Sequence, residues 1–245
     1  MRRIQLTVAY DGTDYHGWQF QPGQPTIEGE LNRCLSSLLG EEIRVIGASR
    51  TDTGVHGLCN IAVFDTDSRI PGEKFSYALN GRLPRDIRIQ DSREVDIDFH
   101  PRRTACRKTY EYRISNQEFA NPLESRYSYF TYLPLDVEKM QKGARHLVGE
   151  HDFASFCAAG STAETTIRRI DDLEVSREGN LIRIRITGNG FLYNMVRIIA
   201  GTLMEAGRGK ISPDKVKEIL QAKDRSKAGP TAAACGLILV KYEFT

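Results

Sequence analysis

Apolar and polar residues alternate along several stretches of the first hundred residues, a period that is typical of β-strands. This alternation predicts strands at 4–10, 43–46, 58–64 and 87–95. After Thr26 the apolar positions recur every three or four residues as far as Gly40, which predicts a helix with a threonine cap and a glycine end. A second, short helix is expected over 72–79. Strand, helix, two strands, helix, strand is the order of a ferredoxin-like α+β unit.

The same kinds of pattern continue from residue 101, so we expect a second α+β unit there. Strands are predicted at 107–115, 127–133, 167–175, 181–187 and 236–242, and helices at 135–148, 192–206 and after Ser212-Pro213. Between two of these strands, Gly179 and Asn180 can adopt positive φ, which favours a hairpin. We therefore predict an α+β fold of two ferredoxin-like units, with domains at 1–100 and 101–245. Their antiparallel sheets are expected to join across a central cleft, with helices on one side.

Length and composition narrow the class of protein. The 245 residues suffice for two domains, and no apolar run approaches the ~20 residues of a membrane span. The first residues lack the apolar segment of a secretory signal, and the five cysteines lie far apart and never in a Cys-x-x-Cys pair. These features predict a soluble, cytoplasmic protein without a disulfide framework.

The type of basic residue gives a clue about the partner. The formal net charge is only +2, but 24 of the 34 basic residues are arginine. The guanidinium group is a planar fork that binds phosphate with two hydrogen bonds and stacks on bases. A surface rich in salt-bridged arginine would have the same composition, so composition alone leaves both explanations open.

A polar, glycine-rich segment at 47–57 separates two of the predicted strands. A loop between strands is a stiff support for a functional side chain, and Asp52 lies at its centre, between Arg50 and His56. Alternatively, Asp52 only closes an Asx-turn on its own backbone. The tripeptide Asp52-Thr53-Gly54 also occurs in aspartic proteases, but those enzymes need two such loops, and this chain has a single copy.

Basic and aromatic residues are interleaved along the strand predicted at 107–115, where Lys108 and Tyr110 share one face. Cations for phosphate and an aromatic ring for a base are what a flipped nucleotide requires. An ordinary core tyrosine beside a solvated charged face would give the same pattern. On a later, otherwise apolar predicted helix, Arg197 needs a counter-charge if it is buried, and Asp52 is the partner that we expect.

Other chemistries find little support in the residues. The glycines near Lys210 lack the spacing of a phosphate-binding loop, the five histidines are scattered, and no Gly-x-Ser-x-Gly elbow occurs. His151-Asp152 is more typical of the start of a capped loop than of a ligand pair.

Six segments, taken together, match one set of family motifs. They lie at 10–19, 49–56, 108–112, 149–156, 190–197 and 229–237. The second of them reads Ser-Arg-Thr-Asp-Thr-Gly-Val-His and contains Asp52. In these segments and in their order, the chain resembles the tRNA pseudouridine synthase A family, and the resemblance covers essentially the whole chain.

The resemblance implies an isomerase that converts uridine to pseudouridine in the anticodon stem-loop of tRNAs, at the expected tRNA positions 38, 39 and 40. It further implies a homodimer in the cytoplasm that uses neither a cofactor nor a metal. Asp52 corresponds to the catalytic aspartate. Its carboxylate either attacks the ribose at C1′ or abstracts the 2′ proton, and the uracil then detaches, turns and rejoins through C5.

The resemblance also implies roles for the other candidate residues. Tyr110 corresponds to a tyrosine that stacks on the target base, and Arg197 to an arginine that pairs with the aspartate. Arg50 corresponds to a residue that contacts the RNA at the extruded nucleotide; His56 and Lys108 are also expected to bind substrate. Two alternatives stay open: an RNA-binding or folding module without catalysis, and an aspartic protease dimer.

Overall fold

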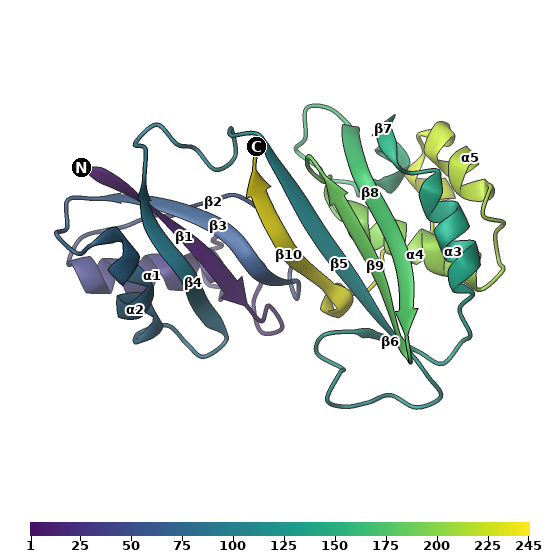
Figure 1. Ribbon diagram of the computed structural model, residues 1–245, viewed down its shortest axis with the longest axis horizontal. Helices are drawn as coiled ribbons and strands as arrows, with labels where there is room; N and C mark the ends of the chain where they lie inside the picture. Colours follow the sequence, from purple (N-terminus) through teal and green to yellow (C-terminus); the bar gives the residue numbers. More distant parts are fainter. The chain divides into compact units, whose positions relative to one another are not determined.

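The computed structural model describes residues 1–245, and contacts within the chain divide it into two compact units. The first unit consists of Met1–Cys106 together with Leu239–Thr245, and the second of Arg107–Ile238 (Figure 1). The division into domains at 1–100 and 101–245 stays a prediction. By contacts, the end of the chain belongs to the first unit, because the last strand returns to it.

The first unit is built on an antiparallel sheet in which β1 lies between β3 and β4. Its strands are β1 (Arg2–Tyr10), the two-residue β2 (Ile46–Gly47), β3 (His56–Thr66) and β4 (Ile87–Val95), and β10 (Leu237–Phe244) lies next to β3. Its helices are α1 (Ile27–Leu39) and α2 (Phe75–Asn80). The order of these elements confirms the predicted ferredoxin-like arrangement.

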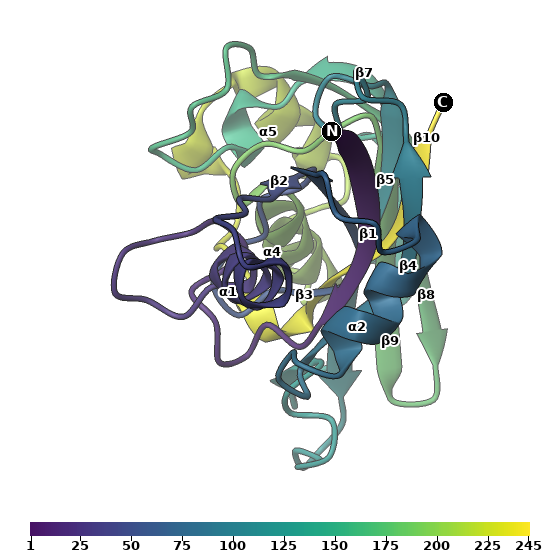
Figure 2. The same ribbon diagram turned by 90° about the vertical axis from the view of Figure 1, so that its left-hand side faces the viewer.

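Both helices of the first unit pack on the same core. Alternate residues of β1, such as Ile4 and Leu6, are fully buried against apolar side chains of α1 and α2. Figure 2 shows α1, seen nearly end-on, to one side of β1. The predicted caps of α1 are confirmed: the Thr26 hydroxyl accepts a hydrogen bond from the amide of Gly29, and Gly40 ends the helix with φ +72°.

The strand predicted at 43–46 is much shorter than expected, since only Ile46–Gly47 pairs with β3. The preceding amides are engaged by side chains of α1. The amide of Ile43 donates to the Ser36 hydroxyl at 2.8 Å, and that of Val45 donates to Asn32 Oδ1 at 2.8 Å. These bonds satisfy backbone groups that a longer strand would have paired with its neighbour.

The second unit has a sheet in the order β5-β9-β8-β7, antiparallel throughout, to which β6 adds a parallel pairing with β5. Its strands are β5 (Cys106–Asn116), β6 (Tyr129–Thr131), β7 (Gly149–Asp152), β8 (Ile167–Glu178) and β9 (Leu181–Gly188). Its helices are α3 (Val137–Arg145), α4 (Met195–Gly207) and α5 (Lys215–Ala222). Short 3-10 turns lie at Gly72–Lys74, Ala154–Phe156, Arg225–Lys227 and Ala234–Gly236 of the whole chain.

Helices cover one face of this second sheet. Ile182, Ile184 and Ile186 alternate along β9 and are fully buried, and α3 packs against both β8 and α4 (Figure 1). The predicted hairpin between β8 and β9 is confirmed, with positive φ at Gly179 only. An α+β architecture of antiparallel sheets, as predicted, is therefore present in the structure.

Sequence analysis missed one strand of the second unit. The segment expected to begin a capped loop at His151-Asp152 is the strand β7, which pairs with β8. The cap itself is nevertheless present, since Asp152 Oδ1 accepts the amide of Ala154 at 3.1 Å. A four-residue strand with two charged residues and a glycine carries no recognisable alternation, so only its pairing partner defines it.

Candidate active site

The loop between β2 and β3 carries two charged residues, Arg50 and Asp52, among neighbours that are buried and support it. Its residues Ser49, Thr51 and Val55 are at most 7% exposed, whereas Asp52 is half-buried and Arg50 is exposed. The support is therefore buried in the protein, and Asp52 is partly accessible to solvent. A partly accessible side chain on a buried support can meet a substrate while its backbone is held in place.

Strand β3 and strand β1 anchor the loop from beneath. The fully buried amide of Asn60 accepts the Ser49 N–H at 3.2 Å and donates to the Ser49 carbonyl at 2.9 Å. The Tyr10 hydroxyl lies 2.9 Å from Thr51 Oγ1, immediately before Asp52. These buried bonds fix the backbone on the N-terminal side of Asp52.

The segment at 11–25, which follows β1, holds the same loop by its backbone. The Trp18 amide donates to the Thr51 carbonyl at 3.0 Å, and the Gly54 amide donates to the Tyr15 carbonyl at 3.3 Å. The carbonyl of Asp52 itself accepts the amide of Val55 at 3.1 Å. Asp52 is thus flanked by hydrogen bonds on both sides.

Two glycines make this close approach feasible. A Cβ atom on Gly12 would lie 2.0 Å from the carbonyl oxygen of Val55. Gly17 has φ +83°, and a Cβ atom there would lie 2.6 Å from the carbonyl oxygen of Thr51. Any larger residue would push the two segments apart.

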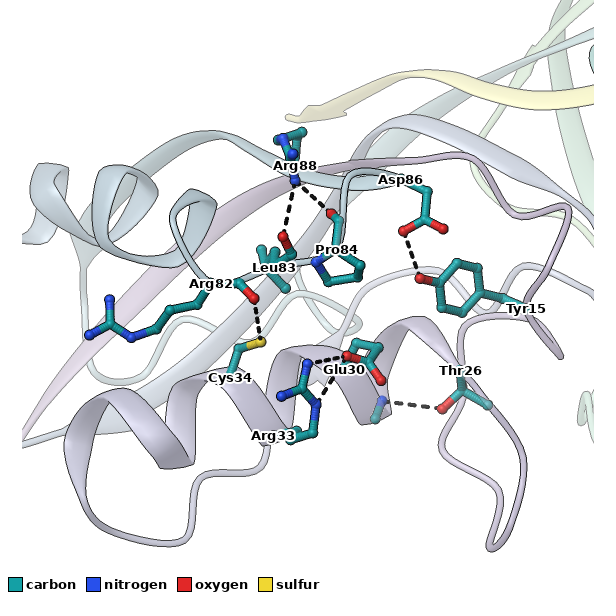
Figure 3. Close-up of polar contacts among 11 residues, drawn as sticks. Tyr15, Thr26, Glu30, Arg33, Cys34, Arg82, Leu83, Pro84, Asp86 and Arg88 are labelled. Carbon is teal, nitrogen blue, oxygen red and sulfur yellow. Dashed lines mark hydrogen bonds and ion pairs between the residues drawn. The ribbon is translucent and has the colours of Figure 1, made fainter.

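Tyr15 links this segment to the approach of β4 (Figure 3). Its hydroxyl donates to Asp86 Oδ1 at 2.7 Å, and the Asp86 carbonyl accepts the amide of Asp11 at 2.9 Å. Burial raises the pKa of Tyr15, and the neighbouring Asp86 carboxylate raises it further. Arg88 Nη1 stabilises the same connection by donating to the carbonyls of Leu83 and Pro84.

His56, at the start of β3, is only 3% exposed. Its Nδ1 accepts the amide of Gly12 at 3.1 Å and also lies 3.2 Å from Asp11 Oδ1. One ring nitrogen of His56 thus meets both the backbone and a side chain of the segment that follows β1. His56 therefore holds the loop in place, and its expected contact with RNA stays a prediction.

In the second unit, Lys108 and Tyr110 lie on one face of β5, as predicted. Tyr110 is 8% exposed, and its ring meets that of Phe191 edge to face, with centroids 5.3 Å apart. This contact fixes the plane of the tyrosine ring. A ring held in this way is pre-organised for stacking on a planar group.

Arg197 lies in the first turn of α4, where its guanidinium is held at two corners. Nε donates to the Ala232 carbonyl at 2.7 Å, and Nη1 donates to Asn194 Oδ1 at 2.8 Å. Asn194 precedes the helix with φ +59°. The segment that carries Ala232 lies against α4, because a Cβ atom on Gly201 would be 1.8 Å from the Pro230 carbonyl oxygen.

The six predicted site residues are divided between the two units. Arg50 and Asp52 lie in the loop before β3 and His56 at the start of β3, all in the first unit, whereas Lys108, Tyr110 and Arg197 lie in the second. The pairing of Asp52 with Arg197 stays a prediction. Sequence analysis overlooked Asn60, although a buried amide within an apolar strand is itself a signal, because such a group needs partners.

No group of three or more His, Cys, Asp or Glu side chains is arranged to hold a metal ion. No helix has the length and apolar character that crossing a bilayer requires.

Comparison with known proteins identifies the class of enzyme. Residues 6–102 and 144–245 match the family described as tRNA pseudouridine synthase. The matched residues include the Asp52 loop in one unit and the first turn of α4 in the other. The match therefore defines an RNA-modifying isomerase.

Three curated relatives extend the match over the full length. Proteins named tRNA pseudouridine synthase A from Acetivibrio thermocellus and Ruminiclostridium cellulolyticum are 48% and 49% identical to this chain, and the alignments cover 100% of both partners. The protein of that name from Brevibacillus brevis is 47% identical over 98% of both chains. The chain belongs to the tRNA pseudouridine synthase family. It is an isomerase that converts uridine in tRNA to pseudouridine.

Proposed function

We propose that this enzyme modifies the anticodon stem-loop of tRNAs, at the expected tRNA positions 38, 39 and 40, with Asp52 acting directly on a flipped-out nucleotide. The observation that carries the proposal is the Asp52 loop. Asp52 is half-buried, and hydrogen bonds on either side hold its backbone. When the nucleophile or base is a side chain of the enzyme, the reaction depends on how that side chain is positioned relative to the ribose.

Asp52 performs one of two first steps. Its carboxylate attacks C1′ of the ribose, so that the glycosidic electron pair leaves with the uracil and a covalent ester forms. Alternatively, it takes the 2′ proton as the uracil leaves, which gives a glycal. In both routes the uracil turns and a bond forms from C5 to C1′. In the first route the ester bond breaks at the same time and frees the Asp52 carboxylate; in the second, C2′ takes its proton back from Asp52. The proton on C5 is then released to solvent, and N1 of the uracil takes up a proton.

The remaining residues serve the same nucleotide. Tyr110 stacks on the target base, Arg197 pairs with Asp52 and keeps it ionised, and Arg50 contacts the RNA where the nucleotide leaves the stack. Lys108 and His56 complete the binding residues. Extruding a base costs a few kcal/mol, which stacking and arginine contacts offset. The enzyme acts as a cytoplasmic homodimer, a state that light scattering would test.

The test is the release of tritium from tRNA labelled at C5 of uridine, for the wild type and for Asp52→Asn. We expect the substitution to lower the rate by a factor on the order of 10³ or more, because the amide neither attacks nor takes a proton. Asp91→Asn removes an exposed aspartate of β4 and serves as a control with an unchanged rate. Locating the pseudouridines in the product tests the anticodon assignment.

Turnover by Asp52→Asn within about tenfold of the wild type would show that another group does the chemistry. A product modified only outside the anticodon arm would contradict the substrate assignment and leave the role of Asp52 intact.

A further inference from the structure

A second arginine reaches the Asp52 loop from a distant part of the chain. Arg102 lies in the turn after β4, and its Nε donates to the carbonyl of Gly47 at 2.7 Å. Gly47 is the last residue of β2, so this bond joins the turn to the start of the loop that carries Arg50 and Asp52. Arg102 is exposed at the surface, and its two terminal nitrogens have no hydrogen bond to the protein.

The turn that carries Arg102 is rigid. The Tyr242 hydroxyl donates to the carbonyl of the buried Pro101 at 3.1 Å. Phe99 packs edge to face against Phe244, with ring centroids 4.9 Å apart. The Arg102 amide is held as well, at 3.2 Å from His100 Nδ1. The side chain therefore starts from a fixed backbone, and its Nε bond removes much of its remaining rotamer freedom.

The charge of Arg102 lies close to that of Arg50. Partial burial lowers the pKa of Arg102, repulsion from Arg50 lowers it further, and Glu28 acts in the opposite direction. Neither arginine forms an ion pair within 4.0 Å of a carboxylate. The Glu28 carboxylate is itself engaged by the amide of Phe20 at 2.7 Å. Two neighbouring cations without an ion pair create a positive potential at the start of the Asp52 loop, which Glu28 offsets only in part.

We propose that Arg50 and Arg102 together bind one phosphate of the RNA backbone next to the nucleotide that Asp52 receives, which rests on the function proposed above for Asp52. With Nε committed to Gly47, the two terminal nitrogens of Arg102 form the fork that matches two phosphate oxygens. The phosphate relieves the repulsion between the guanidinium groups. Because Arg102 belongs to a rigid turn, the bound phosphate fixes the register of the RNA relative to the Asp52 loop.

The test compares Arg102→Gln with Arg103→Gln, because both residues are exposed arginines of one turn and both changes remove one charge. Binding of tRNA is measured in the Asp52→Asn background, in which turnover does not interfere. We expect Arg102→Gln to weaken binding about tenfold, because it removes one hydrogen-bonded charge pair with the phosphate. Arg103→Gln should weaken binding less than about twofold. Arg102→Gln should also reduce the salt dependence of log Kd by about one phosphate contact.

Replacing single phosphates by an uncharged group identifies the phosphate that Arg102 contacts. Anticodon stem-loop RNAs with a single methylphosphonate, placed in turn on each side of the target uridine, lack one phosphate charge. At the phosphate bound by Arg102, the methylphosphonate should weaken binding of the parent enzyme, and Arg102→Gln should then have little additional effect. At other positions the two changes should add.

Three outcomes would overturn the inference. They are equal effects of Arg102→Gln and Arg103→Gln, additive effects at every methylphosphonate position, and a fall in thermal stability that accounts for the whole loss of binding. Each of them leaves the tritium-release result for Asp52→Asn unaffected, so failure of this inference is distinguishable from failure of the proposed function.

Discussion

Tyr15 shows how a single residue supports the Asp52 loop. Its carbonyl accepts the Gly54 amide, and its hydroxyl donates to Asp86, so it joins the Asp52 loop to the start of β4. Neither role is chemical, and the residue is only 6% exposed. Under the proposed function, Tyr15 therefore acts only by placing its neighbours.

Tyr15→Phe should lower the free energy of unfolding by about 1 kcal/mol at pH 7, the value of one buried hydrogen bond. It should also change the pH dependence. The pKa of Tyr15 is raised by folding above its ordinary value of 10.0, so its stabilising contribution is complete below that pH. It is lost as pH rises further, because only the unfolded state releases the proton readily. Urea unfolding between pH 7 and 11 checks this: wild type should lose its advantage over the variant above about pH 10.

At the scale of the element, the segment at 11–25 supports the Asp52 loop. Its sequence pattern predicts no more than a loop. In the structure, its glycines differ in what surrounds them. Gly17 and Gly23 have similar φ, +83° and +74°, but only Gly17 abuts the other loop. For Gly23, a Cβ atom would have no neighbour within 4 Å.

This difference gives a matched pair of variants. Gly23→Ala should cost about 1 kcal/mol of stability, the strain of positive φ, and leave the rate of pseudouridine formation unchanged. Gly17→Ala adds a clash with the Thr51 carbonyl and should lower that rate at least about tenfold through displacement of Asp52. Thermal unfolding and tritium release measure both quantities. Equal rates for the two variants would mean that the contact does not position Asp52.

At the scale of the whole molecule, the proposed mechanism uses groups from two units, with Asp52 in the first and Arg197 in the second. Arg197 is held by Ala232 and Asn194 within its own unit, so its position does not depend on Asp52 alone. A functional link between the two residues is therefore best measured as an energy of interaction.

A double-mutant cycle on the single-turnover rate provides this measurement. If Asp52 and Arg197 act as one unit, Asp52→Asn and Arg197→Lys together should slow the reaction hardly more than Asp52→Asn alone. Binding of tRNA should change less than the rate in Arg197→Lys. Fully additive losses, with binding and rate falling equally, would make Arg197 an independent RNA contact.

Much of the fold could be predicted because its signals are local. Alternation of period two marked β1, β3 and β4, and Thr26 and Gly40 marked the ends of α1. Local pattern failed where pairing partners decide the structure. β2 is shortened because side chains of α1 take its amides, and β7 exists only by pairing with β8.

The sequence by itself determined the class of fold, the family and the residue types available for catalysis, since caps, periodicity and motif order are carried by neighbouring residues. Only the tertiary structure decided what holds the backbone around Asp52 in place and which arginine reaches the start of its loop from elsewhere in the chain. Arg102 is 55 positions from Gly47, and Tyr242 is 141 positions from Pro101. Hydrogen bonds between residues so far apart leave no period or spacing in the chain, because they form only when the sheet brings the two segments together.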